Sequence, residues 1–382
     1  MNPPDVQAYR LITTSNELER FVDRIGNEKM LAVDLEADSM FHYQEKVCLL
    51  QMAANGENVV IDPLQVADLS PLIPVFGNKK VCKVFHGADY DVRSLHRDFS
   101  IEINNLFDTQ LASMILGERE TSLGAVVARR FGIQLDKRFQ KKDWSQRPLP
   151  EGMVAYAASD VFHLIPLARQ LMGELAVKGR LAWVEEECRH LSAVRAVEND
   201  GEPLFMRFRG AGRLQPRNLA ALEGLLQYRR DLANKKDRPL FKVFSNTSLL
   251  KIASEMAATP RDMEVAGCLS PKQIRIHGKA LAAVVQHAKS LPVKALPVYP
   301  RKRRPNLSPR IPERVKAVKK WRDGVADDLD MDPALLFTKT LMTAIAVDKP
   351  SKLQQLRQVE GIRNWQVKAF GKALLAVLST MP

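Results

Sequence analysis

Cysteine is scarce in this chain, with four residues among 382, at Cys48, Cys82, Cys188 and Cys268. No two of them form a C-x-x-C pair, and no histidine lies at the spacing that would complete a set of zinc ligands. The sequence therefore supports neither a disulfide framework nor a structural zinc site. We expect the four cysteines to be buried thiols.

Long apolar runs are also missing. The first ten residues lack the basic-then-apolar pattern of a signal peptide, and charges interrupt every apolar stretch well short of the ~20 residues that span a bilayer. Hydrophobic residues make up 46% and charged residues 26% of the chain, which is typical of a folded globular protein. We expect a cytoplasmic protein of two or three domains that does not associate with membranes.

Net charge is divided unevenly along the sequence. Residues 1–200 carry 23 Lys and Arg against 29 Asp and Glu, whereas residues 201–382 carry 34 against 15. This division fits a catalytic domain that gathers cations, followed by a region that binds a polyanion. A merely solubilising surface is the alternative, but an excess over half of the chain favours nucleic-acid binding.

The first 200 residues predict an α/β domain, a mixed sheet flanked by helices. Apolar, strand-like segments come first, at residues 30–36, 48–54, 58–64 and 80–87. Helical patterns follow from Asp89 onward, and the last of them predicts one long helix from Met153 to about Lys178. Residues 198–211 have no sustained period and are predicted to link this domain to the next.

The second half predicts two all-helical modules, at residues 211–290 and 313–382. Between them, residues 291–312 contain six prolines and the basic cluster Arg301, Lys302, Arg303 and Arg304, so we expect an extended linker. The pattern RVKAVKKWRDGVADDL in the second module matches LAALEGLLQYRRDLA in the first. We interpret the two modules as a diverged tandem repeat.

Three segments carry acidic residues in patterns that suggest chemistry. Asp34 and Glu36 are two residues apart on a predicted strand, so their side chains share one face, which is costly without a cation. Exposed acids at a strand end are the alternative, but four apolar residues precede the pair. Tyr156 and Asp160 are four residues apart on a predicted helix and are also neighbours.

The remaining segment, VFHGADYDVRSL, places Asp89 and Asp91 at the start of a predicted helix. One acid could complement the helix dipole while the other faces the site. Carboxylates suit Mg²⁺ or Mn²⁺, and the seven histidines are too dispersed for a softer metal. Two such ions could activate water for phosphodiester hydrolysis, with Tyr156 orienting that water.

Together, the three segments resemble the exonuclease motifs of the DEDD superfamily, in the subclass with tyrosine in the third motif. Over residues 10–380 the chain is similar to the bacterial ribonuclease D family, including the segments FDTQLA and LDKRFQKKDWSQRPL. The resemblance implies a ribonuclease H-like fold. In that family the second aspartate lies five residues after a histidine, here His86, which selects Asp91 over Asp89. Leu35 replaces a frequent threonine and should point away from the metals.

The two helical modules resemble HRDC domains, which bind nucleic acids. The residues that match in the first module are Tyr228, Arg229, Arg230, Asp237 and Pro239. The second module keeps Trp321 and Arg322 but lacks the basic, proline-containing loop.

The resemblance implies a 3′→5′ exoribonuclease that uses two divalent cations and releases nucleoside 5′-monophosphates, in the 3′ maturation of tRNA or other stable RNA. It implies metal ligation by Asp34, Glu36, Asp91 and Asp160, with Tyr156 as the fifth catalytic residue. We expect Asp108 to stabilise a helix or to support the metal ligands from behind, rather than to bind a metal itself. Candidate RNA contacts are Phe85, His86, Tyr228, Arg229, Arg230, Arg301, Arg303 and Arg304, with a core role as the alternative for Phe85 and His86.

Two other functions remain as alternatives. A 3′→5′ DNA exonuclease would use the same carboxylate site. An inactive RNA-binding protein that keeps the fold is an alternative of another class, although the presence of all five site residues argues against it.

Overall fold

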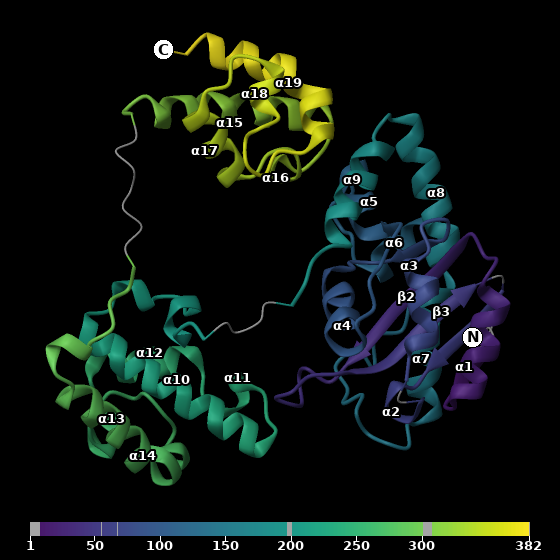
Figure 1. Ribbon diagram of the computed structural model, residues 1–382. Coiled ribbons are helices and arrows are strands. Elements are labelled where there is room, and N and C mark those ends of the chain that lie inside the picture. The colour runs from purple at the N-terminus through teal and green to yellow at the C-terminus, as the bar shows by residue number, and fades with distance from the viewer. Residues whose placement is uncertain (1–7, 55, 67, 197–200, 301–307, 382) are drawn as a thin grey trace. The chain divides into compact units, whose positions relative to one another are not determined.

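The computed structural model describes residues 8–54, 56–66, 68–196, 201–300 and 308–381. It divides into two compact units (Figure 1). One contains the described residues of 1–37, 47–196 and 305–382, and the other those of 38–46 and 197–304. Among the described residues, no helix is both long and apolar enough to cross a bilayer.

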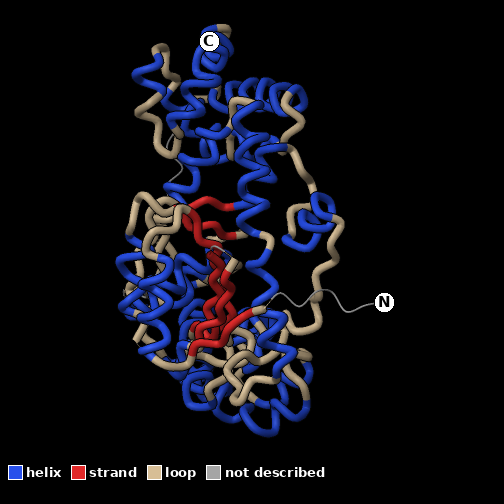
Figure 2. The backbone as a smooth tube through the Cα atoms, turned by 90° about the vertical axis from the view of Figure 1, so that its right-hand side faces the viewer, coloured by secondary structure: helices blue, strands red, loops and turns tan. Residues whose placement is uncertain are grey.

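The first unit is built around a six-stranded mixed sheet, which Figure 2 shows with helices packed around it. Its strands are β1 (Tyr9–Ile12), β2 (Met30–Ala37), β3 (Val47–Ala54), β4 (Glu57–Ile61), β5 (Cys82–Phe85) and β6 (Leu106–Asp108). They lie in the order β1-β4-β3-β2-β5-β6. The pairs β4–β3 and β3–β2 are antiparallel, and the other pairs are parallel. The predicted mixed sheet with flanking helices is confirmed.

Helices cover the sheet and complete the α/β part of the first unit. They are α1 (Ser15–Ile25), α2 (Pro63–Val66), α3 (Ile73–Gly77), α4 (Asp89–Phe99), α5 (Thr109–Leu116), α6 (Leu123–Phe131), α7 (Glu151–Phe162), α8 (Leu164–Val177) and α9 (Leu181–Leu191). Every side chain of β3 is buried, which is the pattern of a central strand covered on both faces.

The long helix predicted from Met153 to Lys178 is wrong, because the chain forms two helices, α7 and α8, that meet at His163. Pro166 explains the break. It has no N–H to donate to the carbonyl of Phe162, and its ring would collide with that carbonyl in a continuous helix. The break lets α7 cover β2, β3 and β4, while α8 packs against β2 and β5.

A buried ion pair anchors the loop that leads into α7. Asp62, at the end of β4, is 1% exposed, and its carboxylate accepts hydrogen bonds from Arg147 Nε and Nη2, both at 2.7 Å. Arg147 Nη2 also donates to the carbonyl oxygen of Cys48 on β3 at 3.0 Å. This one side chain therefore ties the start of α7 to two strands of the sheet.

The second unit is an all-helical module with its own core. Its helices are α10 (Pro216–Lys236), α11 (Leu240–Val243), α12 (Asn246–Glu255), α13 (Pro260–Val265) and α14 (Pro271–Ser290). The predicted linker at 198–211 contributes to this core, because Phe205 and Phe208 pack against α10 and its neighbours. Tyr299, in the predicted linker at 291–312, packs against Phe205 in the same way.

A second all-helical module belongs to the first unit. Its helices are α15 (Ile311–Asp328), α16 (Pro333–Leu336), α17 (Lys339–Asp348), α18 (Leu353–Leu356) and α19 (Asn364–Ser379). The module packs on α9, where the Glu186 carboxylate accepts the backbone N–H groups of Asn364 and Trp365 at 2.7 and 2.9 Å. The rings of Trp183 and Trp365 stack with their centroids 4.7 Å apart. The carboxylate therefore caps α19 from outside the module.

Replacing Arg147 with leucine should destabilise the first unit by about 3–5 kcal/mol, because the buried carboxylate of Asp62 would lose its charged partner. Urea unfolding followed by tryptophan fluorescence measures the loss. The control is Arg138→Leu in the same loop, where the arginine side chain is 79% exposed in its pair with Asp136, so the loss should stay below about 1 kcal/mol. Equal losses in both variants would contradict the role given to the buried pair.

Candidate active site

Strand β2 presents two acidic side chains on one face. Asp34 lies opposite Gln51 of β3, and Glu36 lies opposite Leu49. The register between β2 and β3 shifts between Glu36 and Ala37, so the pairing of the two strands is irregular beside Glu36. Both carboxylates are half-buried. Leu35, on the other face, is 8% exposed and packs in the hydrophobic core, as predicted.

The two aspartates of α4 have different surroundings. Asp89 is exposed and forms a bidentate ion pair with Arg93, with hydrogen bonds of 2.8 and 3.0 Å. Asp91 is 7% exposed and interacts electrostatically with Asp34. Asp89 is thus engaged along its own helix, while Asp91 belongs to the acidic cluster on β2.

Asp108 fixes the turn that leads into α4. Its carboxylate accepts hydrogen bonds from the backbone N–H groups of Gly87 and Ala88, at 3.0 and 2.8 Å, and it also caps α5. Gly87 has a φ of +80°, and a Cβ there would lie 2.9 Å from the side chain of Gln110. Asp108 therefore acts behind the site by positioning the helix that carries Asp91.

Helix α7 brings Tyr156 and Asp160 to the same cluster. The Tyr156 ring is 8% exposed and lies between two aromatic rings, Phe139 at 5.9 Å and Trp144 at 6.0 Å between centroids. Asp160, one turn further along α7, is half-buried. The segment before α7 thus holds Tyr156 in place, a role for Phe139 and Trp144 that the sequence patterns did not reveal.

Burial, together with neighbouring negative charges, raises the pKa values of the acidic groups. Desolvation raises the pKa of Asp34 to about 7, and desolvation together with Asp34, Asp160 and Asp91 raises the pKa of Glu36 to about 10. Desolvation and the charge of Asp34 also raise the pKa of Asp91 and of Asp160 well above the usual value. The pKa of Tyr156 is raised by desolvation and then by Asp160, so its hydroxyl stays protonated at neutral pH.

This donor set fits hard divalent cations. All four acidic groups supply oxygen, which Mg²⁺ and Mn²⁺ prefer, and their mutual repulsion is relieved when a cation neutralises them. Among the described residues, no three His, Cys, Asp or Glu side chains already lie at the spacing of a closed metal site.

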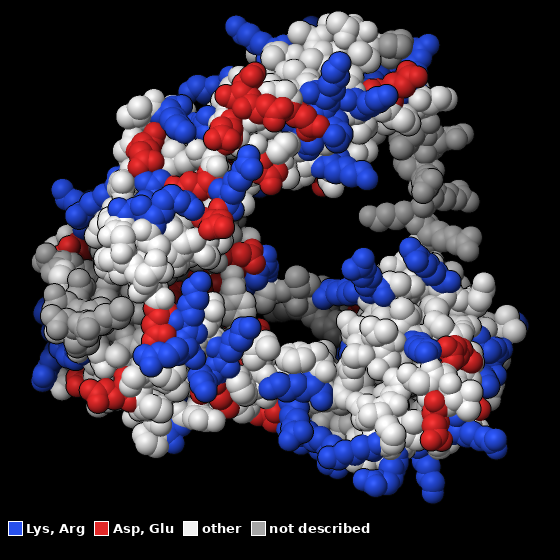
Figure 3. Space-filling view, turned by 180° about the vertical axis from the view of Figure 1, so that it is seen from behind, with Lys and Arg blue, Asp and Glu red and all other residues white. Residues whose placement is uncertain are grey.

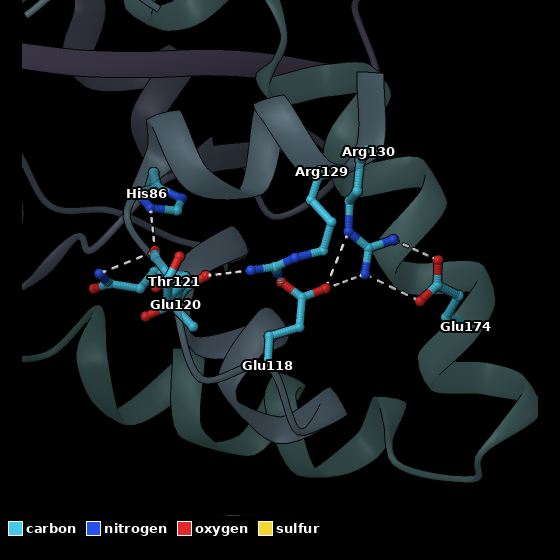
Figure 4. A network of polar contacts seen from close by, with 8 residues as sticks. His86, Glu118, Glu120, Thr121, Arg129, Arg130 and Glu174 are labelled. Carbon is cyan, nitrogen blue, oxygen red and sulfur yellow. Dashed lines mark hydrogen bonds and ion pairs between the residues drawn. The ribbon is translucent and has the colours of Figure 1, made fainter. Parts of the chain in front are cut away.

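His86 and Phe85 do not have the surroundings predicted for RNA contacts. Phe85 is completely buried, and both ring nitrogens of His86 have partners, Thr109 Oγ1 at 2.9 Å and the Thr121 carbonyl at 2.8 Å. Desolvation lowers the pKa of His86, which keeps the ring neutral. Figure 4 shows His86 directed at Thr121, beside a network in which Glu118 lies between Arg129 and Arg130. Both residues therefore have core roles.

Two predicted RNA contacts in the first helical module make hydrogen bonds within that module. Arg229 is 7% exposed and donates to the carbonyl oxygen of Phe244 at 3.1 Å. Tyr228 is half-buried and its hydroxyl lies 3.0 Å from His277 Nδ1. In the second module, Arg322 donates to the carbonyl oxygen of Phe337 in the same way. The amphipathic pattern of the sequence does not predict this burial, because one buried arginine interrupts the leucine face.

The surface of the second unit is nevertheless basic. Lys and Arg predominate over Asp and Glu on its visible face, at the lower right of Figure 3. Helix α14 contains no acidic residue, and the exposed basic side chains near it and near the end of α10 are Lys235, Lys236, Arg238, Lys242, Lys272, Arg275 and Lys279. Arg230 is half-buried beside Gln227. The predicted contacts Arg301, Arg303 and Arg304 lie outside the described residues.

Comparison with known proteins agrees with this arrangement. A family model described as 3′-5′ exonuclease matches residues 9–176, and the HRDC domain model matches residues 218–285 and 312–378. Ribonuclease D of Serratia proteamaculans is 31% identical over 76% of this chain and 78% of its own length. The chain belongs to the ribonuclease D family.

Further members extend the match to nearly the whole chain. Ribonuclease D of Gluconacetobacter diazotrophicus is 30% identical over 96% of this chain and 92% of its own. The crystal structure of Escherichia coli RNase D covers 98% of this chain and 100% of its own, with 27% identity and a TM-score of 0.74. The chain is accordingly a 3′→5′ exoribonuclease of the ribonuclease D type, in a family that uses divalent metal ions.

In a chelating buffer, Asp34→Asn should raise the Tm of the first unit, and the gain should grow from about pH 5 to about pH 8. The raised pKa of Asp34 means that wild-type folding loses stability as the pH rises from ~4 through about 7. Differential scanning calorimetry measures the gain, which we expect to reach about 2–4 °C. Asp89→Asn, which removes an exposed ion pair, is the control and should show no such gain. A gain independent of pH would contradict the raised pKa of Asp34.

Proposed function

We propose that Asp34, Glu36, Asp91 and Asp160 hold two divalent cations, Mg²⁺ or Mn²⁺, at the centre of the exonuclease site. The observation that carries this proposal is the burial of four acidic groups from three separate elements, which raises the pKa of each first through desolvation and, for Glu36, Asp91 and Asp160, also through repulsion by Asp34. Such repulsion destabilises the fold, and cations that bind all four groups offset it. The proposed exonuclease domain covers residues 1–200, followed by HRDC domains at 211–290 and 313–382 and a linker at 291–312.

In the proposed reaction, water adds to the phosphorus of the last phosphodiester, and the bond from phosphorus to the 3′ oxygen breaks. The 3′ oxygen takes a proton, and a nucleoside 5′-monophosphate leaves. Two bound cations would supply charge stabilisation for the attacking and leaving oxygens. Tyr156 keeps its proton because its pKa is raised, so its hydroxyl orients the attacking water through a hydrogen bond.

The proposed substrates are structured RNAs with a free 3′ end, including tRNA precursors and other stable RNA. The similar Escherichia coli enzyme is described as an exoribonuclease involved in structured RNA processing. Exposed lysines and arginines of the second unit would hold such RNA through its phosphates, and this binding would weaken as salt rises. Asp91, rather than Asp89, is the proposed ligand because Asp89 is engaged with Arg93.

Asp91→Asn should lower kcat on a 3′-extended tRNA by at least about a hundredfold, because one charged group of the cation site is lost. The matched control is Asp89→Asn on the same helix, which should change kcat less than about threefold, as expected for a surface ion pair. Release of mononucleotides in Mn²⁺ measures both variants. The reverse order of effects would make Asp89 the ligand.

Matched RNA and DNA oligomers separate the proposed activity from the alternatives. We expect cation-dependent mononucleotide release from the 3′ end of RNA, with slower release from DNA. Faster degradation of DNA would favour a DNA exonuclease. Tight RNA binding without release in Mg²⁺ or Mn²⁺ would favour an inactive binding protein.

A further inference from the structure

Gln51 is a polar residue at the centre of the sheet, beside the acidic cluster. On β3 it lies directly opposite Asp34 of β2 and opposite Val60 of β4, both in antiparallel register. Residues directly opposite each other in an antiparallel pair project from the same face. The side chain of Gln51 therefore shares the face of Asp34.

Helix α7 covers that face. Leu49 and Val60, which share the face with Gln51, pack in one cluster with Tyr156, Ala157 and Ala158 of α7. Gln51 itself is completely buried. Its carboxamide is thus enclosed between the strands and the helix that carries Tyr156 and Asp160.

The carboxamide of Gln51 has no hydrogen-bond partner among the described residues, at either Nε2 or Oε1. Its neighbours on β3 are apolar, including Leu50 and Met52, so the strand itself has no need of a polar group. A buried polar side chain without a partner lowers stability, and an isosteric apolar side chain would be neutral or better. The unpartnered carboxamide therefore points to a partner that depends on the state of the site.

We propose that Gln51 is a positioning residue for Asp34, whose Nε2 donates a hydrogen bond to the Asp34 carboxylate when cations occupy the site. A carboxylate has about four acceptor positions, so Asp34 can bind a cation and still accept this bond. Ligating carboxylates are commonly oriented by hydrogen bonds from behind. The inference rests on the proposed cation site and adds a residue to it.

Gln51→Met tests the inference, because methionine has a similar shape and no donor. In chelating buffer we expect an unchanged Tm or a rise of about 2 °C. The Mn²⁺ concentration that gives half of the cation-dependent rise in Tm should increase at least about tenfold. In activity assays the half-maximal Mn²⁺ concentration should increase similarly, while the KM for RNA at saturating Mn²⁺ stays the same.

Met52→Leu is the matched control, because Met52 is the next residue on β3 and packs in the core on the other face. It should leave the Mn²⁺ dependence unchanged. An unchanged Mn²⁺ dependence in Gln51→Met would overturn the inference. A large fall in Tm in chelating buffer, for both Gln51→Met and Gln51→Leu, would also overturn it, since Gln51 would then make a bond that the cation-free fold requires.

The same measurements distinguish an error in the proposed cation site from an error in the role of Gln51. If the wild-type protein shows no Mn²⁺-dependent rise in Tm, the proposed cation site is wrong, whatever Gln51 does. If the wild type shows that rise and Gln51→Met shows it at the same concentration, only the role of Gln51 is wrong.

Discussion

Repulsion among four carboxylates is the constraint on which the exonuclease part of this protein depends. Asp34, Glu36, Asp91 and Asp160 come from three elements, and desolvation raises the pKa of each, with the charge of Asp34 raising the pKa of the other three further. The surrounding fold has to hold them together against that repulsion. A fully buried central strand and the α7 helix above it supply the rigid support.

The supporting contacts lie just behind the acidic groups. Asp108 fixes the turn before the helix of Asp91, two aromatic rings flank Tyr156, and Arg147 ties the start of α7 to the sheet. The helical modules use their charged residues differently. There, one buried arginine in each copy donates to a backbone carbonyl, and the exposed lysines outside the core are the ones that we propose to contact the phosphates of RNA.

Much of the site follows from periodicity in the sequence. A spacing of two on a strand pairs Asp34 with Glu36, and a spacing of four on a helix pairs Tyr156 with Asp160. Periodicity does not choose between Asp89 and Asp91, because that choice depends on which acid is buried beside Asp34 of β2. It also misses the break before Pro166, which that proline causes locally, and it does not settle the burial of Phe85 and Arg229, which depends on neighbours that are distant in sequence.

Proton release on cation binding tests the central claim most directly. Isothermal titration of Mn²⁺ into the protein near neutral pH, in buffers with different ionisation enthalpies, counts the protons released. Because the raised pKa values keep some of the four groups protonated without cations, we predict net release of about one proton or more. Mn²⁺ binding without proton release would contradict the account, because the four carboxylates would then already be ionised in the cation-free protein.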